Sequence, residues 1–218
     1  MANQDQDVSG KLKRLRREYG AESLDVSSAA ADPFDLFDIW FNQAIQCGTE
    51  EPNAMALATA SESIPSVRTV LLKDYSREGM IFYTNYGSAK GRDLDVNPRA
   101  EALFYWPVLV RQVRVAGAVR KVSAEESDRY FKTRPAGAQI AAVVSRQSQA
   151  VESRAVLERA WQDYFARSGA DIRRPDYWGG YILLPDKYEF WQGRDNRLHD
   201  RLLYTLKGAQ WQICRLAP

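Results

Sequence analysis

The feature that most constrains the fold is a change of hydrophobic period at Ala54. Before it, Asp32-Pro33 forms a helix N-cap and first-turn pair, and helical spacing continues to Gly48. After it come the β-type runs AMALATA, SVRTVLLKDY and GMIFYTNY, which are separated only by the turn segments SESIP and SREG. Strands joined by such short connections predict an antiparallel meander.

The rest of the chain adds more strands and a few helices. Ser88 and Asn97-Pro98 bracket a short helix, Ser123 and Glu126 form a capping box that opens another through Phe131, and residues 154–169 carry an amphipathic helical pattern. Further strands are predicted at AEALFYW, VRQVRVAGAVRKV, WGGYILL, KYEFWQG, RLHDRLLYTL and QWQICRL. Strand meanders with inserted helices favour an α+β protein built on an antiparallel barrel.

The 218 residues suit one domain, and no linker follows residue 31. We therefore predict a flexible N-terminal arm over residues 1–31 and a single domain over residues 32–218. Within the arm, KLKRLRREY at residues 11–19 is either a solvated charge run or a flap that orders over an anionic ligand.

Composition excludes several classes of function. A net charge of +2 is too small to argue for a nucleic-acid partner. The two cysteines, Cys47 and Cys214, form no CxxC motif, and with one histidine they predict neither a disulfide framework nor a metal site. No apolar run approaches the roughly 20 residues that span a bilayer, and the N-terminus lacks a signal-peptide pattern, so we expect a cytoplasmic protein without a membrane partner.

The segment EFWQGRDNRLHDR at residues 189–201 holds the only histidine in the chain. If it is a strand, its alternation places Arg197, His199 and Arg201 on one face and Asp200 on the other. Three cationic or potentially cationic groups on one face are hard to explain by packing. They predict a site for an anion or a polarised substrate.

Other cationic residues lie within apolar runs or at strand ends, at Arg68, Lys73, Lys90 and Arg134. Each of these side chains either points to solvent through strand alternation or belongs to an anion-binding site. Taken together, they favour a phosphate as the ligand. The sequence has neither GxGxxG nor a P-loop, so side chains and the helix start near Ser88 would hold that phosphate. The aromatic residues Trp178, Phe190 and Trp191 are either core or the edge of a flat cofactor.

A series of ordered motifs then resembles the pyridoxamine 5′-phosphate oxidase family over nearly the whole chain. The motifs are RREY (16–19), RTVLLK (68–73), FYTN (82–85), RQV (111–113), RYFKTRP (129–135), SRQS (145–148), EFWQ with RLHDR (189–201) and the terminal RLAP. The resemblance implies a homodimeric split β-barrel with FMN at the subunit interface.

The resemblance also implies roles for individual residues. Arg197 and His199 would lie against the substrate ring as the catalytic pair, and Arg16, Arg17, Glu18 and Tyr19 would form the flap over it. The substrate phosphate would contact Lys73, Tyr130 and Arg134. The FMN contacts would be Arg68, Val70, Leu71, Tyr83, Thr84, Lys90, Gln112, Gln147, Ser148, Trp191 and Arg201.

Two positions depart from the family pattern. Ala89 stands where an arginine would grip the FMN phosphate, and Ala138 stands where a serine would contact the substrate phosphate. The loss at Ala89 removes a charge-assisted contact, which is worth about 1.5–3 kcal/mol of binding.

The implied reaction is the FMN-dependent oxidation of pyridoxamine or pyridoxine 5′-phosphate to pyridoxal 5′-phosphate in vitamin B6 metabolism, with O₂ reduced to H₂O₂. One alternative is a related split-barrel FMN oxidase that acts on another cyclic metabolite, such as a phenazine precursor. The other is a non-catalytic protein that binds flavin or a B6 vitamer.

Overall fold

The computed structural model describes residues 23–167 and 171–218. Its strands form one antiparallel sheet in the order β2-β1-β5-β6-β7-β4-β3, and β8 pairs with β7 and then with β9. The strands are β1 (Ala54–Ser61), β2 (Ile64–Leu71), β3 (Asp74–Tyr75), β4 (Met80–Asn85), β5 (Arg99–Trp106), β6 (Arg111–Lys121), β7 (Trp178–Gln192), β8 (Asp200–Lys207) and β9 (Gln210–Arg215).

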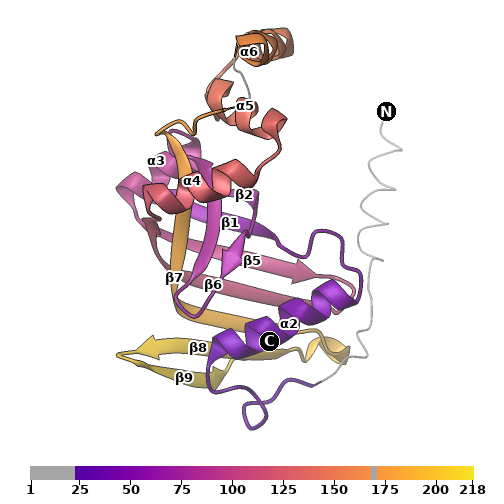
Figure 1. Ribbon diagram of the computed structural model, residues 1–218. Coiled ribbons are helices and arrows are strands. Elements are labelled where there is room, and N and C mark those ends of the chain that lie inside the picture. Colours follow the sequence, from indigo (N-terminus) through magenta and orange to yellow (C-terminus); the bar gives the residue numbers. More distant parts are fainter. Residues whose placement is uncertain (1–22, 168–170) are drawn as a thin grey trace, which may run out of the picture.

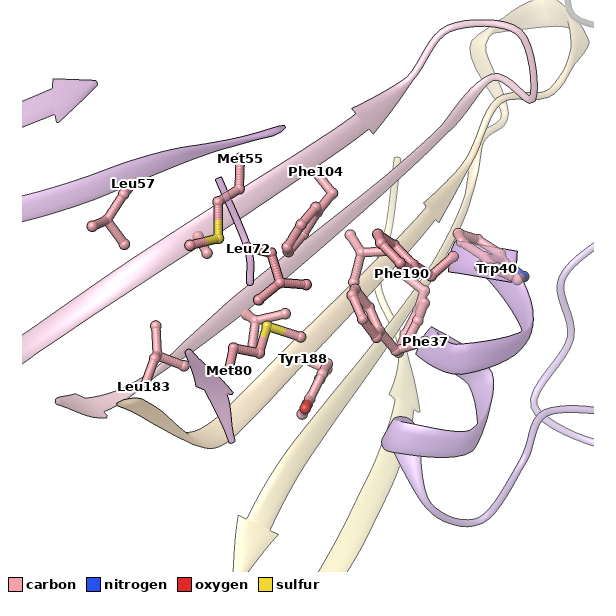
Figure 2. Close-up of a cluster of buried hydrophobic side chains, with 14 of the residues drawn as sticks. Phe37, Trp40, Met55, Leu57, Leu72, Met80, Phe104, Leu183, Tyr188 and Phe190 are labelled. Atoms are coloured by element: carbon pink, nitrogen blue, oxygen red, sulfur yellow. The ribbon is translucent and has the colours of Figure 1, made fainter. Parts of the chain in front are cut away.

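The sheet closes into a barrel because its two ends meet. β2 leads through Leu72 directly into β3, and β2 also contacts β4. Apolar side chains from the facing strands fill the interior, as Figure 2 shows for Met55, Leu57 and Phe104, which are at most 1% exposed. The predicted α+β antiparallel barrel is therefore confirmed.

Helix α2 (Pro33–Gln46) covers one end of the barrel (Figures 1 and 2). Asp32 caps it by accepting a hydrogen bond from the Phe34 amide, as the Asp-Pro pair predicts. Its apolar face packs edge-on against barrel aromatics: the Trp40 and Phe190 ring centroids lie 5.3 Å apart.

The other helices lie near the opposite end of the sheet (Figure 1). The Ser88 side chain caps α3 (Ala89–Val96), and the Ser123 side chain caps α4 (Ala124–Thr133) by accepting from the Glu126 amide. Both predicted caps are confirmed. α5 (Ala136–Val144) and α6 (Arg154–Arg167) follow.

Strand β7 is longer than the sequence indicates. We predict two strands at WGGYILL and KYEFWQG, and the structure joins them into one strand of 15 residues. Pro185 is accommodated because the register with β6 shifts between Ala116 and Gly117. Gly117 is needed there, since a Cβ would lie 1.9 Å from the Leu184 carbonyl oxygen.

Two details of the structure differ from what the sequence predicts. Leu24 and Ala30, which we assign to a flexible arm, contact the barrel: Leu24 is buried, and the Ala30 carbonyl accepts a bond from the Tyr204 hydroxyl. The chain also leaves the sheet after Gln192, turns through a 3-10 helix at Asp195–Arg197 and rejoins it only at Asp200. Arg197 and His199 are therefore not strand residues.

None of the helices within residues 23–167 and 171–218 has both the length and the apolar character that crossing a bilayer requires.

Candidate active site

A cavity of about 870 Å³ opens between β2, β4 and the starts of α3 and α5. Eleven residues that we predict for the cofactor and substrate sites line it: Arg68, Val70, Leu71, Lys73, Tyr83, Thr84, Lys90, Tyr130, Arg134, Gln147 and Ser148. Segments far apart in the sequence therefore meet in one place, and we call these eleven residues the cavity cluster.

Lys90 is the most unusual member of the cavity cluster because it is 5% exposed. Its Nζ donates to the hydroxyls of Thr84 at 3.0 Å and Ser88 at 3.3 Å, and no carboxylate in the described residues pairs with it. Burial, followed by the nearby charge of Arg68, lowers the pKa of Lys90. A buried ammonium without a counter-charge predicts an anionic ligand.

Arg68 is held by its own strand neighbourhood. Its guanidinium donates to Thr59 Oγ1 at 2.6 Å, and Asp93 of α3 lies 3.6 Å away as its ion-pair partner. Thr59 also donates to Asp93 at 2.6 Å. Sequence reasoning does not single out Asp93, because an acidic residue in the exposed-looking run RDLD gives no signal of a partner on β2.

Arg134 lies over the face of Trp178, with its guanidinium carbon 4.5 Å from the ring centroid. Its Nη1 is buried without a hydrogen-bond partner in the described chain. Burial lowers the pKa of Arg134, but a guanidinium stays charged at any physiological pH. A permanent cation in the wall of the cavity is a second signal for an anionic ligand.

Aromatic rings form the wall beside Arg134. The Tyr83 and Tyr130 rings stack with centroids 3.8 Å apart, and Trp178 stacks on Tyr83 at 5.7 Å. Burial raises the pKa of Tyr83 to about 12, so its hydroxyl stays protonated. Trp178, which the sequence leaves open between core and cofactor edge, is both buried and part of the cavity lining.

The segment after α5 completes the cavity cluster. Gln147 Oε1 accepts from the Thr84 hydroxyl at 3.1 Å and from the Asn85 amide at 3.3 Å. Ser148 adopts a φ of 69°, in the left-handed region that non-glycine residues rarely occupy. Backbone held in this way is frequent in binding sites.

Three other residues that we predict for the cofactor meet elsewhere, in a row across adjacent strands. Gln112 of β6 pairs with Trp191 of β7, and Trp191 pairs with Arg201 of β8. Directly paired residues on antiparallel strands point to the same face of the sheet. We call Gln112, Trp191 and Arg201 the three-strand row.

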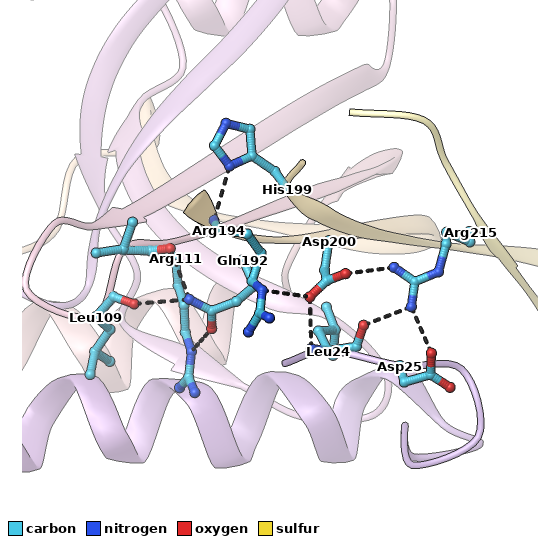
Figure 3. A network of polar contacts seen from close by, with 10 residues as sticks. Leu24, Asp25, Leu109, Arg111, Gln192, Arg194, His199, Asp200 and Arg215 are labelled. Atoms are coloured by element: carbon cyan, nitrogen blue, oxygen red, sulfur yellow. Dashed lines mark hydrogen bonds and ion pairs between the residues drawn. The ribbon is translucent and has the colours of Figure 1, made fainter. Parts of the chain in front are cut away.

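His199 belongs with the three-strand row, since its ring lies 4.7 Å from that of Trp191. The Arg194 amide donates to its Nδ1 at 3.0 Å (Figure 3), which leaves the proton of the neutral ring on Nε2. Partial burial and, second, the charge of Arg197 lower the pKa of His199. At neutral pH the imidazole is therefore uncharged.

Arg197 does not share a strand face with His199 and Arg201, so that prediction is wrong. The backbone φ angles at Asn196 and Arg197 are 54° and 64°, and the alternation of a strand does not apply to a turn. Asp200 does turn away from His199, toward Arg215 and the Leu24 amide (Figure 3).

The cavity cluster and the three-strand row lie at opposite ends of β7. Tyr83 pairs with Gly180 near the start of that strand, and Trp191 lies eleven residues further along. At about 3.3 Å per residue this is roughly 36 Å of strand. Figure 1 shows β8 and α4 correspondingly far apart. The two groups are therefore well separated along β7.

The two departures from the family pattern occupy different positions. Ala89 lines the cavity beside Lys90, whereas Ala138 lies in the first turn of α5 and is not among the lining residues. The predicted flap, Arg16 to Tyr19, lies outside the described residues.

Comparison with known proteins decides the family. A model described as pyridoxamine 5′-phosphate oxidase matches residues 41–167, and one described as pyridoxine 5′-phosphate oxidase C-terminal dimerisation region matches residues 178–218. The chain belongs to the pyridoxamine 5′-phosphate oxidase family. A relative from Paraburkholderia phymatum, named pyridoxine/pyridoxamine 5′-phosphate oxidase, is 52% identical over 209 residues, which span 95% of this chain and 99% of the relative.

Solved structures support the same fold. The crystal structure of PhzG from Burkholderia lata 383, in complex with tetrahydrophenazine-1-carboxylic acid, has a TM-score of 0.86 at 29% identity and covers 91% of this chain and 99% of that one. A pyridoxamine 5′-phosphate oxidase-related, FMN binding protein from Nostoc punctiforme has a TM-score of 0.69 at 18% identity, covering 87% of this chain and 100% of that one.

This membership confirms the split-barrel fold, the enzyme class and FMN as the cofactor of the family to which the chain belongs. The cavity fits such a group, because the buried ammonium of Lys90 at the start of α3 has hydroxyl partners but no carboxylate partner among the described residues, and an anion there would compensate its charge.

Proposed function

We propose that this protein oxidises pyridoxamine or pyridoxine 5′-phosphate to pyridoxal 5′-phosphate, with O₂ as the electron acceptor and H₂O₂ as the second product. The observation that carries the proposal is the cavity wall around Arg134. Arg134 packs on the ring of Trp178 and lines the same cavity as the stacked rings of Tyr83 and Tyr130, so a cationic phosphate donor and a flat apolar surface share one cavity. A phosphorylated pyridine ring has both complementary parts.

FMN, when bound, supplies the two-electron oxidation and the reaction with O₂. The chain's own residues bind and orient it. We assign its phosphate to Lys90 and Arg68, with the Thr84 hydroxyl and the N-terminus of α3 beside them. Val70, Leu71, Tyr83, Gln147 and Ser148 would complete the cavity side.

The site is proposed to be shared between two copies of the chain in a homodimer. Gln112, Trp191 and Arg201 are expected to contact the same FMN as the cavity cluster, yet they lie at the other end of β7. A two-fold axis between the protomers would bring the three-strand row of one protomer next to the cavity of the other. Both groups would then contact the same FMN. The name of the C-terminal family model, a dimerisation region, agrees with it.

Arg197 and His199 are the proposed catalytic residues. Arg197, in the exposed turn before β8, would hold the substrate ring at reacting distance from the flavin. The neutral His199 would donate from Nε2 to a polar substituent of the ring. Lys73, Tyr130 and Arg134 would bind the substrate phosphate, and the segment from Arg16 to Tyr19 would cover it. Two free cysteines agree with a location in the cytoplasm.

A second candidate function is oxidation of a reduced phenazine carboxylate, which the likeness to PhzG favours. Oxygen consumption and H₂O₂ release are measured with the purified yellow protein on pyridoxine phosphate, pyridoxamine phosphate, unphosphorylated pyridoxine and tetrahydrophenazine-1-carboxylic acid. We expect turnover on the two phosphorylated vitamers alone. Turnover on the phenazine precursor alone would overturn the proposal in favour of the second candidate, and a colourless protein without flavin would overturn both.

A further inference from the structure

The starting observation is a buried carboxylate that the proposed mechanism does not use. Glu189 of β7 is 7% exposed, and it is the only buried acidic residue in the part of the chain that the structure describes. It lies two residues before Trp191 and therefore faces the same side of the sheet as the three-strand row. Burying a carboxylate is costly unless it is paired, so its partners matter.

The partners of Glu189 are two arginines on the neighbouring strands. Its Oε1 accepts from Arg201 Nε at 2.9 Å and lies 2.8 Å from Arg201 Nη2, while its Oε2 accepts from Arg114 Nη1 at 3.1 Å. Arg114 has a second partner, Glu101, at 2.6 Å. Arg201 has a different second partner, because its Nη1 donates to the Ala217 carbonyl at 2.8 Å.

These contacts leave a defined part of Arg201 for a ligand. A guanidinium has five N–H donors in a fixed plane. Glu189 and Ala217 take three of Arg201's donors, on Nε, Nη2 and Nη1, so one N–H on each of Nη1 and Nη2 is directed away from the protein contacts. The position of the Glu189 carboxylate sets the orientation of these two N–H groups.

We propose that Glu189 is a positioning residue, which fixes the guanidinium of Arg201 against the flavin through this fork, with the Ala217 carbonyl as the second support. The inference rests on the proposed function, in which Arg201 contacts FMN. Because Glu189 neutralises Arg201, the pair offers directed hydrogen bonds rather than net positive charge. Its natural acceptors are the carbonyl groups of the flavin ring, while the phosphate belongs to Lys90 and Arg68.

The test is a double-mutant cycle on the affinity of the dimeric apoprotein for FMN, measured from the quenching of FMN fluorescence. Arg201→Ala and Glu189→Leu should each raise the dissociation constant about tenfold, and the double variant should bind no more weakly than Arg201→Ala alone. Glu189→Gln, whose amide oxygen can still accept from Arg201, should recover most of the affinity.

Glu101→Leu is the matched control, because it removes the other carboxylate of the same network without touching Arg201. It should bind FMN like the unaltered protein. If Glu189→Leu does not give a folded protein by circular dichroism, Glu189→Asp replaces it in the cycle. The shorter side chain withdraws the carboxylate, and the same criteria apply.

The outcomes separate this inference from the proposed function. If Arg201→Ala weakens FMN binding and the Glu189 variant does not, or if the two effects add in the double variant, the positioning role is wrong and the Arg201 contact stands. If Arg201→Ala leaves the affinity unchanged, the proposed contact between Arg201 and FMN is wrong, and the inference falls with it.

Discussion

Two cations of the cavity cluster and one cation of the three-strand row are held in opposite ways. In the cavity cluster, Lys90 is buried with only hydroxyl partners, and Arg134 keeps an unsatisfied buried donor. In the three-strand row, Arg201 is matched by the carboxylate of Glu189. A buried charge without a counter-charge destabilises the free protein, and a bound anion compensates it. A guanidinium that is already paired with a carboxylate contributes mainly oriented hydrogen-bond donors. This difference supports our proposal that the cavity binds the phosphates and that the three-strand row contacts the flavin ring.

The largest expected effect concerns the turn beside the row. Arg197→Ala should lower turnover on the phosphorylated vitamer by about ten- to a thousandfold while FMN stays bound, because alignment at the reacting carbon is lost. Steady-state oxygen consumption and the flavin absorbance of the same sample measure the two quantities. Arg120→Ala, at an exposed arginine on β6, serves as the control. Unchanged turnover in Arg197→Ala would show that this turn does not position substrate.

The next largest effect is expected from removing the buried positive charge of the cavity cluster, which distinguishes it from the three-strand row. Lys90→Met should raise the FMN dissociation constant about 10- to 150-fold, since charge-assisted contacts contribute about 1.5–3 kcal/mol. The same change should raise the melting temperature of the apoprotein, because it removes a buried charge that has hydroxyl partners but no carboxylate partner among the described residues. Lys207→Met, at an exposed lysine, should alter neither. Lower apoprotein stability together with unchanged FMN affinity would mean that Lys90 is structural.

Much of this arrangement could be predicted from the sequence, and the misses have physical causes. Helix caps at Asp32, Ser88 and Ser123 are local signals, so they could be located from a few residues. The turn at Asp195–Arg197 overlaps the run Gly-Arg-Asp-Asn, whose residues favour turns, and this local signal outweighs the strand alternation that predicts the orientation of Arg197.

Other features depend on contacts that no local pattern encodes. Asp93 forms an ion pair with Arg68, and Glu189 forms one with Arg201. Both pairs arise because segments distant in the sequence pack together. The pairing of Gln112 with Trp191 depends on the β6–β7 register, which shifts at the irregularity next to Pro185 in β7. The resemblance names such residues one at a time, but only the fold shows that they form two separate groups.

A smaller effect would sharpen the phosphate assignment. Ala89→Arg should tighten FMN binding about tenfold, because the new guanidinium would stand in the cavity wall at the start of α3, next to Lys90. Fluorescence titration of the apoprotein measures it. Ala138→Arg is the matched comparison, since Ala138 does not line the cavity, and should leave FMN affinity unchanged. Equal affinities for Ala89→Arg and the unaltered protein would place the FMN phosphate away from the start of α3.

The smallest expected effect is a shift in one proton equilibrium at the row. His199 is the only histidine in the chain, so its ring gives a single histidine signal set in a proton NMR titration. Its pKa should lie below the ordinary value of about 6.5, and Arg197→Gln should raise it, because the second cause of the depression is the charge of Arg197.

The catalytic activity should depend on this protonation equilibrium, because the neutral imidazole predominates only above the pKa of His199. The acid limb of kcat/KM should therefore fall below pH ~6.5 in the unaltered enzyme and move to higher pH in Arg197→Gln, whatever the loss of absolute rate. Lys207→Gln, which removes an exposed charge at the end of β8, should leave the titration in place. An acid limb that does not move while the NMR pKa rises would show that the protonation state of His199 does not limit the reaction.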